Sequence, residues 1–245
     1  MLKFKFVLRH TIIVLAAISL LHCAQKPKLE TLDLMQPAAK GNSDLIRQRI
    51  AQGADPNQKN DLGTTALMLA AYRGHVEVIK ILLMAGANIN LQDSQQQSAL
   101  HYAALGNQTG TCPPLLAAKA LVDQADQDEL TPLMLAARFG TTDCVESLLN
   151  AGAQVNHSDS TGWNALFFAI PRGKDEVVKM LLQKQARLDL QEEHGWSPLH
   201  IAALYHQPQI YKLLKSQGAS EKLKDKEGKT PPQLQREIDK KFPSR

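Results

Sequence analysis

The feature that most constrains the fold is a pattern that returns every 33 residues. Leucine recurs at this step from Leu67, and the later members are Leu100, Leu133, Leu166 and Leu199. Alanine recurs in the same way from Ala70. An amide or carboxyl side chain opens each period: Asn60, Asp93, Asp126, Asp159, Glu192 and Asp225. A fixed period of this length predicts a solenoid of stacked units, because one unit alone cannot bury its apolar face.

Each period predicts two helices. The hydroxyl residue before Pro132 or Pro198 can cap a helix that starts at the proline, and Gly74 is placed to end such a helix. A second helix is predicted by apolar residues that share one helical face: Val76, Val78, Ile79, Leu82 and Leu83. Gly86 stops this helix, and a short polar segment leads to the next period.

The motifs inside the period resemble the ankyrin repeat. They are T-P-L-x-x-A-A at 131–137, S-P-L-H-x-A-A at 197–203, and L-L-x-x-G-A at 82–87 and 148–153. The resemblance covers about residues 27–245. It implies an all-α ankyrin-repeat solenoid of stacked helix-turn-helix units with short β-hairpin fingers. It also implies that partners contact the finger tips and the end of the first helix of each repeat.

The pattern divides the chain into segments. We expect a signal peptide at 1–22, a tether at 23–32, an N-terminal capping repeat at 33–59 and a C-terminal capping segment at 225–245. Between the caps lie five repeats: 60–92, 93–125, 126–158, 159–191 and 192–224. The last four residues, 242–245, are expected to be disordered. Pro171, Gln185 and His206 are local departures, since the first ends a helix early and the other two replace glycines.

The copy at 93–125 is irregular. G-N-Q-T-G-T-C-P-P stands where its second helix should begin, and the two prolines suit a helix start but not a helix interior. We therefore predict a helix from near Pro113 to about Asp123, followed by a short finger because the usual Gly-Ala ending is missing. A tolerated insertion is favoured over a bulge that shapes a partner site.

The N-terminus predicts export. Lys3, Lys5 and Arg9 precede an apolar run from Thr11 to Leu21, which as a helix is about 16 Å long against about 30 Å of hydrocarbon. Such a segment is typical of a signal peptide. Leu20-Leu21-His22-Cys23 resembles a bacterial lipoprotein box, which implies a lipid on Cys23 and a place in the cell envelope, membrane-anchored or periplasmic. His22 departs from that box, and an ordinary signal with an unmodified cysteine is the alternative.

Charge and cysteine content limit the other functions. The net charge of +4 falls to about +1 without the three cations of the signal, so nucleic acid is not an expected partner. Cys112 and Cys144 could form a disulfide in an oxidising compartment. The spacing of about 10 Å between packed helices disfavours this bond, and a buried thiol at Cys144 is the simpler interpretation.

We find no catalytic constellation, cofactor motif or metal site. His101 and His200 occupy the same position of the period, where ankyrin repeats use histidine for local hydrogen bonds. His194, His200 and His206 are six residues apart, which does not place them on one helix face, so metal binding is not expected.

The candidate binding residues lie at the predicted finger tips and helix ends. They are Asp61, Leu62, Tyr72, Arg73, Asp128, Leu130, Arg138, Phe139, Trp163, Arg172, His194, Trp196 and Tyr205. Tryptophan, tyrosine and arginine dominate binding hot spots. We expect a monomeric, non-enzymatic, exported and lipid-anchored scaffold or adaptor that binds a partner protein on its concave face. An inhibitor or immunity protein that neutralises an exported enzyme is the alternative. An enzyme, for which residues 105–125 would be the place to look, and a purely structural envelope protein are further alternatives.

Overall fold

The computed structural model describes residues 32–139 and 141–241. The predicted signal peptide, Cys23, most of the tether and the last four residues lie outside the described residues. None of the described helices is long and apolar enough to cross a membrane.

The described chain is a succession of short helices. They are α2 (Met35–Lys40), α3 (Ser43–Ala51), α4 (Ala66–Arg73), α5 (Val76–Met84), α6 (Ala99–Gly106), α7 (Cys112–Ala117), α8 (Pro132–Phe139), α9 (Thr142–Asn150), α10 (Ala165–Ala169), α11 (Asp175–Gln183), α12 (Pro198–Leu204), α13 (Pro208–Ser216) and α14 (Pro231–Lys241), and a 3₁₀ turn, η2 (Ile170–Arg172), continues α10. The all-α solenoid expected from the repeat is confirmed. Pro171 ends α10 early, as predicted, and α14 begins two residues before the expected Gln233.

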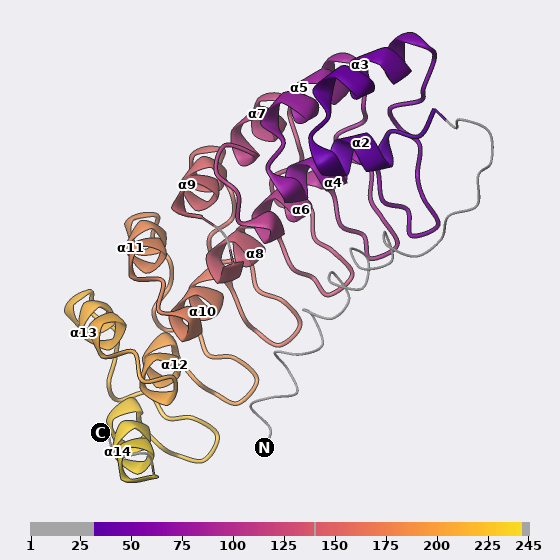
Figure 1. Ribbon diagram of the computed structural model, residues 1–245. Coiled ribbons are helices and arrows are strands. Elements are labelled where there is room, and N and C mark those ends of the chain that lie inside the picture. Colours follow the sequence, from indigo (N-terminus) through magenta and orange to yellow (C-terminus); the bar gives the residue numbers. More distant parts are fainter. Residues whose placement is uncertain (1–31, 140, 242–245) are drawn as a thin grey trace.

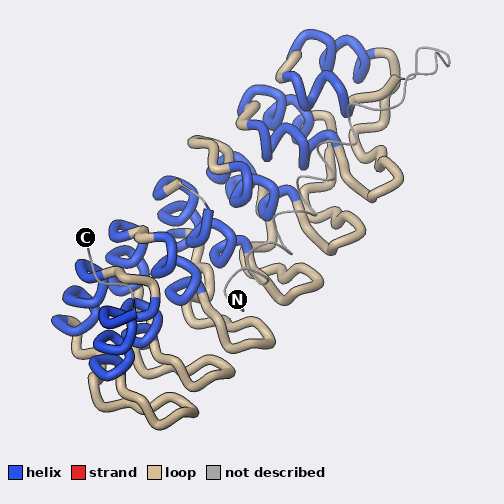
Figure 2. The backbone as a smooth tube through the Cα atoms, turned by 60° about the horizontal axis from the view of Figure 1, so that its bottom comes forward, coloured by secondary structure: helices blue, strands red, loops and turns tan. Residues whose placement is uncertain are grey.

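The helices form two parallel rows. The even-numbered helices α2 to α14 make an inner row, and the odd-numbered helices α3 to α13 make an outer row. The long loops that lead from an outer helix to the next inner helix project from one side as fingers (Figure 1, Figure 2). A large apolar core runs along the stack between the rows, and a second, small cluster of Leu204, Leu234 and Ile238 packs α14 onto α12. The recurring Leu67 and Ala70 and their counterparts are all buried, which explains why the same residue returns at these positions in each repeat.

The first residue of each period shapes its finger. One oxygen of the Asp93 side chain accepts hydrogen bonds from the backbone N–H groups two and four residues later, at 2.9 Å each. The same pair of bonds forms at Asn60, Asp126, Asp159, Glu192 and Asp225. An acceptor side chain is therefore needed at this position to close the turn.

The fingers are not β-hairpins, which corrects that part of the prediction. The described residues contain one isolated bridge, between Lys59 and Thr65, and no named strand. Adjacent fingers are instead joined by single backbone hydrogen bonds, such as Ser94 N to Leu62 O at 2.9 Å and Lys226 N to His194 O at 3.0 Å. Each finger is too tightly turned to form a ladder, because its opening side chain occupies the N–H groups that a strand would use.

The irregular copy begins its second helix near the predicted place and ends it early. Helix α7 starts at Cys112 but stops at Ala117, not near Asp123. Lys119 adopts a left-handed conformation (φ 63°), and Ala120 N donates to Leu115 O at 3.1 Å to close the helix. Lys119 thus takes the place of the helix-ending glycine. The finger that follows has the regular length, so the prediction of a short finger was wrong.

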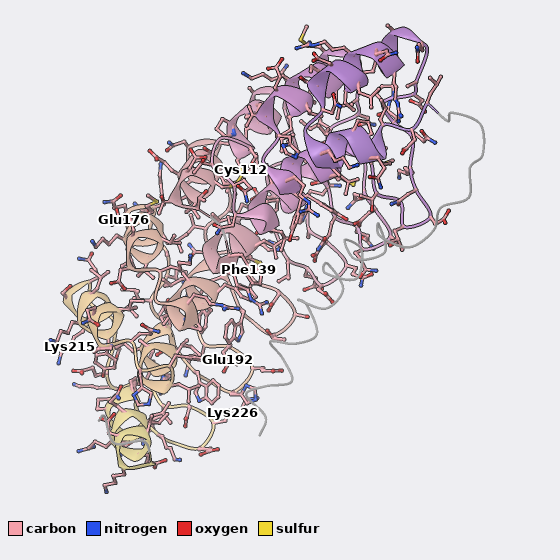
Figure 3. The ribbon with its side chains drawn as sticks, viewed as in Figure 1. Cys112, Phe139, Glu176, Glu192, Lys215 and Lys226 are labelled. Atoms are coloured by element: carbon pink, nitrogen blue, oxygen red, sulfur yellow. A yellow bond between two sulfur atoms is a disulfide. The ribbon has the colours of Figure 1, made fainter. Side chains whose placement is uncertain are left out.

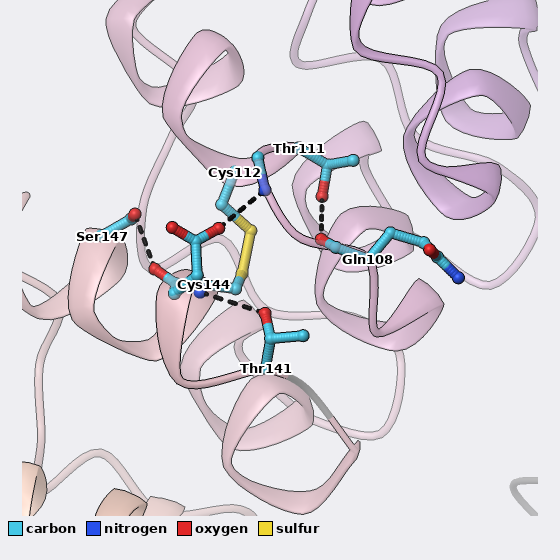
Figure 4. The surroundings of a disulfide bond; sticks show 8 residues. Gln108, Thr111, Cys112, Thr141, Cys144 and Ser147 are labelled. Atoms are coloured by element: carbon cyan, nitrogen blue, oxygen red, sulfur yellow. Dashed lines mark hydrogen bonds between the residues drawn. A yellow bond between two sulfur atoms is a disulfide. The ribbon is translucent and has the colours of Figure 1, made fainter.

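A disulfide joins the irregular copy to the next one. Cys112 at the start of α7 and Cys144 in α9 are bonded, with 5.3 Å between their Cα atoms (Figure 4). We had expected a buried thiol at Cys144, because regularly packed helices are too far apart for a disulfide, so this expectation is corrected. Gly110, in the five-residue loop 107–111, donates from its backbone N–H to the Asp143 carboxylate at 2.8 Å, which ties the start of α7 to the start of α9. Both cysteines are buried.

Candidate partner-binding surface

The inner face is the side of the molecule formed by the fingers and the C-terminal ends of the inner helices. Aromatic and arginine side chains gather on it at the ends of α8 and α10. We call five of them the Arg–aromatic cluster: Arg138, Phe139, Trp163, Phe168 and Arg172. Figure 3 shows Phe139 at the end of α8, on the side from which the fingers project.

Both guanidinium groups of the cluster lie against the ring of Phe139. The Arg138 Cζ atom is 4.7 Å from the centre of this ring and the Arg172 Cζ atom is 5.4 Å from it. Arg138 also lies 5.8 Å from the ring centre of Phe168. These distances are those of cation–π contacts. Two like charges are thus held over one aromatic ring.

Arg138 is the unusual member because it is only 7% exposed. Burial and the nearby charge of Arg172 lower the pKa of the Arg138 guanidinium to about 10, while Tyr205 raises it. We expected Arg138 on the open surface of the inner face. It is instead covered by its aromatic neighbours, and only part of its side chain reaches the solvent.

Trp163 packs on its own repeat. Its ring lies 5.2 Å from Phe168 and 5.9 Å from Phe167, centre to centre, and it is partly buried. Trp196 occupies the same position one period later. It stacks on His194 at 4.9 Å and donates from Nε1 to Asp225 of the next finger at 3.3 Å. Both tryptophans therefore stiffen their fingers and still present part of a ring.

The other predicted residues divide by exposure. Asp61, Leu62, Arg73, Asp128, Arg172 and His194 are exposed, whereas Tyr72, Phe139 and Tyr205 are partly buried. Leu130 is a correction, since it is 3% exposed. Its side chain lies in the core and its carbonyl accepts from the His101 ring at 3.2 Å, so it cannot contact a partner.

A second, smaller group lies near the N-terminal end of the inner face. Arg73 Cζ is 5.9 Å from the Tyr72 ring centre, and Tyr72 meets Tyr102 edge to face at 6.4 Å. The Tyr102 hydroxyl donates to Asp93 at 2.8 Å, and burial raises the pKa of this hydroxyl. The Tyr72 and Arg73 contacts are thus distinct from the Arg–aromatic cluster and from the stack of His194 on Trp196.

Sequence reasoning missed Phe168 and Tyr102. They occupy the same position of the period, where the other repeats have Leu69, Leu135 and Ile201. An aromatic residue at a core position of a helix looks like ordinary packing. The available signal was the change from aliphatic to aromatic at one repeat position beside a helix-end arginine.

The histidines have the structural role that we expected. The Ser98 backbone N–H donates to His101 Nδ1 at 3.1 Å, so Nε2 carries the proton and donates to Leu130 O. His200 makes the same contacts with Ser197 and Lys229. Ligand atoms of Glu192, Glu193 and His194 lie within 4.8 Å of one another. The Glu192 side chain accepts from the backbone N–H groups of His194 and Trp196, as the first residue of each of the other fingers does, so we assign it a structural role.

Models of known families agree with this architecture. A model of three ankyrin repeats matches residues 34–126 and again residues 108–192, and a single-repeat model matches residues 194–226. The chain belongs to the ankyrin-repeat family. No curated protein matches the sequence.

Among solved structures, this ankyrin-repeat chain is similar to the crystal structure of the human ASB11 ankyrin repeat domain. The identity is 27%, the TM-score is 0.76, and the match covers 82% of this chain and 90% of that chain. Ankyrin repeats are in general protein–protein interaction modules without catalytic activity, and the arrangement of the inner face fits this role.

Proposed function

We propose that the chain is an exported, lipid-anchored adaptor that binds a partner protein through its inner face. The observation that carries the binding role is the Arg–aromatic cluster. It joins partly exposed aromatic rings to two guanidinium groups at the ends of successive inner helices, which is the composition of a binding hot spot. The helices hold these side chains in place, so docking orders few groups.

Two further observations support the export part of the proposal. The basic and apolar pattern of residues 1–22 is that of an export signal followed by Cys23. A disulfide between Cys112 and Cys144 is of the kind that persists in oxidising compartments. The binding proposal does not depend on either observation.

Photocrosslinked capture from an envelope extract tests the binding role. Trp163→Ala with Trp196→Ala should abolish capture, and Arg172→Ala, at an exposed position, should weaken it without affecting folding. Met84→Ala is the matched control, since Met84 is 88% exposed on an outer helix. Thermal unfolding of each variant separates lost binding from lost structure. Unchanged capture by the folded tryptophan variant would show that the partner does not use this face.

Intact mass and N-terminal sequencing of the protein from cells test the anchor. A diacylated or triacylated Cys23 is the expected result. An unmodified chain that starts near residue 23 would make the protein a lipid-free exported binder. A chain that still starts at Met1 would contradict export.

A further inference from the structure

Two arginines on the inner face have no acidic partner among the described residues. No described carboxylate lies within ion-pair distance of Arg138 or Arg172. Arg47 and Arg187 elsewhere in the chain pair with Glu77 and Asp189 at 2.5 and 3.0 Å. Arg47 and Arg187 are thus neutralised locally, whereas the two arginines of the cluster keep an uncompensated positive charge.

Holding these two charges together has a free-energy cost. Arg138 is largely removed from water, and Arg172 repels it, which together lower the pKa of its guanidinium. The quadrupole of Phe139 offsets part of this cost for both guanidinium groups, but a π face is a weaker partner than a carboxylate. An anion placed beside the two guanidinium groups would relieve the repulsion and gain charge-assisted hydrogen bonds.

We propose that the Arg–aromatic cluster binds a carboxylate side chain of an acidic peptide segment in the partner protein, with an adjacent apolar side chain on the partly exposed rings of Trp163 and Phe139. The inference rests on the proposed function and specifies the chemistry of the segment. The planar fork of Arg172 suits a bidentate contact with a carboxylate, since this side chain is exposed and can adjust.

The surroundings favour a short acidic segment over a polyanion. The fingers on either side of the cluster carry Asp128, Glu129, Glu192 and Glu193, so a polyanion that extended beyond the two arginines would meet carboxylates. The net charge outside the signal is close to neutral, and nucleic acid binding depends on many phosphate contacts. One or two carboxylates beside an apolar residue match a site with two cations and several rings.

A random 12-residue peptide library displayed on phage tests the proposal. The full-length protein, purified in detergent, should enrich peptides that place Asp or Glu next to Leu, Phe or Trp. A fluorescein-labelled copy of the most enriched peptide should lose about tenfold in affinity when its acidic residues are replaced by Asn and Gln, because the charge-assisted contacts with the arginines are lost. Arg172→Gln in the protein should cause a similar loss.

Two control proteins separate the cluster from general charge effects. Arg47→Gln with Arg187→Gln removes two exposed cations elsewhere and should leave peptide affinity unchanged. Arg138→Lys keeps the charge of the buried group but loses its planar shape, and should weaken binding less than Arg138→Gln does. Far-UV circular dichroism confirms that each variant is folded.

The outcomes distinguish this inference from the proposed function. No enrichment of acidic residues, or an affinity unaffected by Arg172→Gln, would refute the carboxylate assignment, while partner capture that depends on Trp163 and Trp196 would leave the binding role intact. Displacement of the labelled peptide by millimolar inorganic phosphate would reassign the site to phosphate. Failure of both capture and peptide binding would overturn both proposals.

Discussion

The neighbouring repeats 93–125 and 126–158 share one period but differ in both helices. In 126–158, α9 has nine residues and buries Cys144, Val145, Leu148 and Leu149. In 93–125, α7 has six residues and buries Cys112 and Leu115. It is shorter because the loop 107–111 replaces the first turn that a regular second helix would have. The second helix of the irregular copy therefore buries fewer residues, but a disulfide bonds it covalently to the next repeat.

The two repeats also differ on the inner face. Phe139 ends α8 and carries the Arg–aromatic cluster, whereas Gly106 stands at the same position of the period at the end of α6. A Cβ atom at residue 106 would lie 2.2 Å from the Tyr72 carbonyl oxygen. The comparison shows that two repeats with the same period can have different roles. Repeat 93–125 is packed tightly against its neighbours, whereas repeat 126–158 carries part of the candidate binding surface.

The largest expected effect comes from reducing the disulfide. A bond that closes a loop of this length, with its cysteines 32 residues apart, contributes about 3–4 kcal/mol in the chain-entropy account. Urea unfolding with and without dithiothreitol should show this difference in the unfolding free energy. Cys112→Ala with Cys144→Ala should be insensitive to the reductant. Equal midpoints for the wild type in both conditions would mean that the bond does not form.

Gly106→Ala should be next in size. The new methyl group would collide with the backbone of the preceding inner helix, which cannot move as a flexible side chain can, so we expect a loss of about 3 kcal/mol. Gly152→Ala in the regular repeat is the control. Its Cβ would meet nothing within 4 Å, and only the left-handed backbone disfavours it, by about 1 kcal/mol. Chemical denaturation of both variants measures the contrast, and similar losses would contradict a special constraint at residue 106.

The third test uses acid. Burial lowers the pKa of His101 to about 4, from about 6.5 for an exposed histidine. Between these values the unfolded chain binds more protons than the folded chain, so stability falls as the pH falls. From pH 7.5 to pH 5 this group should cost about 2 kcal/mol of unfolding free energy.

A substitution isolates the contribution of His101. The repeats 60–92 and 126–158 have Met68 and Met134 at this position, where sulfur accepts from the capping threonine backbone N–H. His101→Met should therefore flatten the dependence of stability on pH. His200, whose pKa is also lowered by burial, remains as an internal reference. An unchanged slope after His101→Met would show that His101 does not titrate in this range.

The smallest expected effect is a gain. Lys119 holds the left-handed conformation that Gly86 and Gly152 hold in the neighbouring repeats. Lys119→Gly should stabilise the chain by about 0.5 kcal/mol, because relief of backbone strain exceeds the added freedom of the unfolded chain. Lys119→Ala keeps the strain and should change little. Thermal unfolding resolves the difference, and a loss of stability in the glycine variant would argue against strain at this residue.

The period was enough to predict the stack and the helix pairs, and it displayed the residue that opens each finger without its hydrogen-bonding role. Those features depend on local spacing, which one sequence displays directly. Arg138 was misplaced because its burial involves the ring of Phe168, and Leu130 because its side chain lies in the core, and the period alone determines neither contact. The contact between Cys112 and Cys144 was disfavoured because regular spacing was assumed across an irregular loop. In each case the missing information is the distance between two repeats, not the structure of one.

The disulfide also sets how far the molecule can lengthen under tension. A solenoid pulled from its ends can release its repeats one after another, since each contacts mainly its neighbours. Cys112 and Cys144 are 32 residues apart in sequence, and their bond prevents the segment between them from being extended. At a maximum of about 3.3–3.6 Å per residue, this segment would otherwise add about 110 Å of extended chain. The middle of the molecule is thus a mechanical stop that opens only when the bond is reduced.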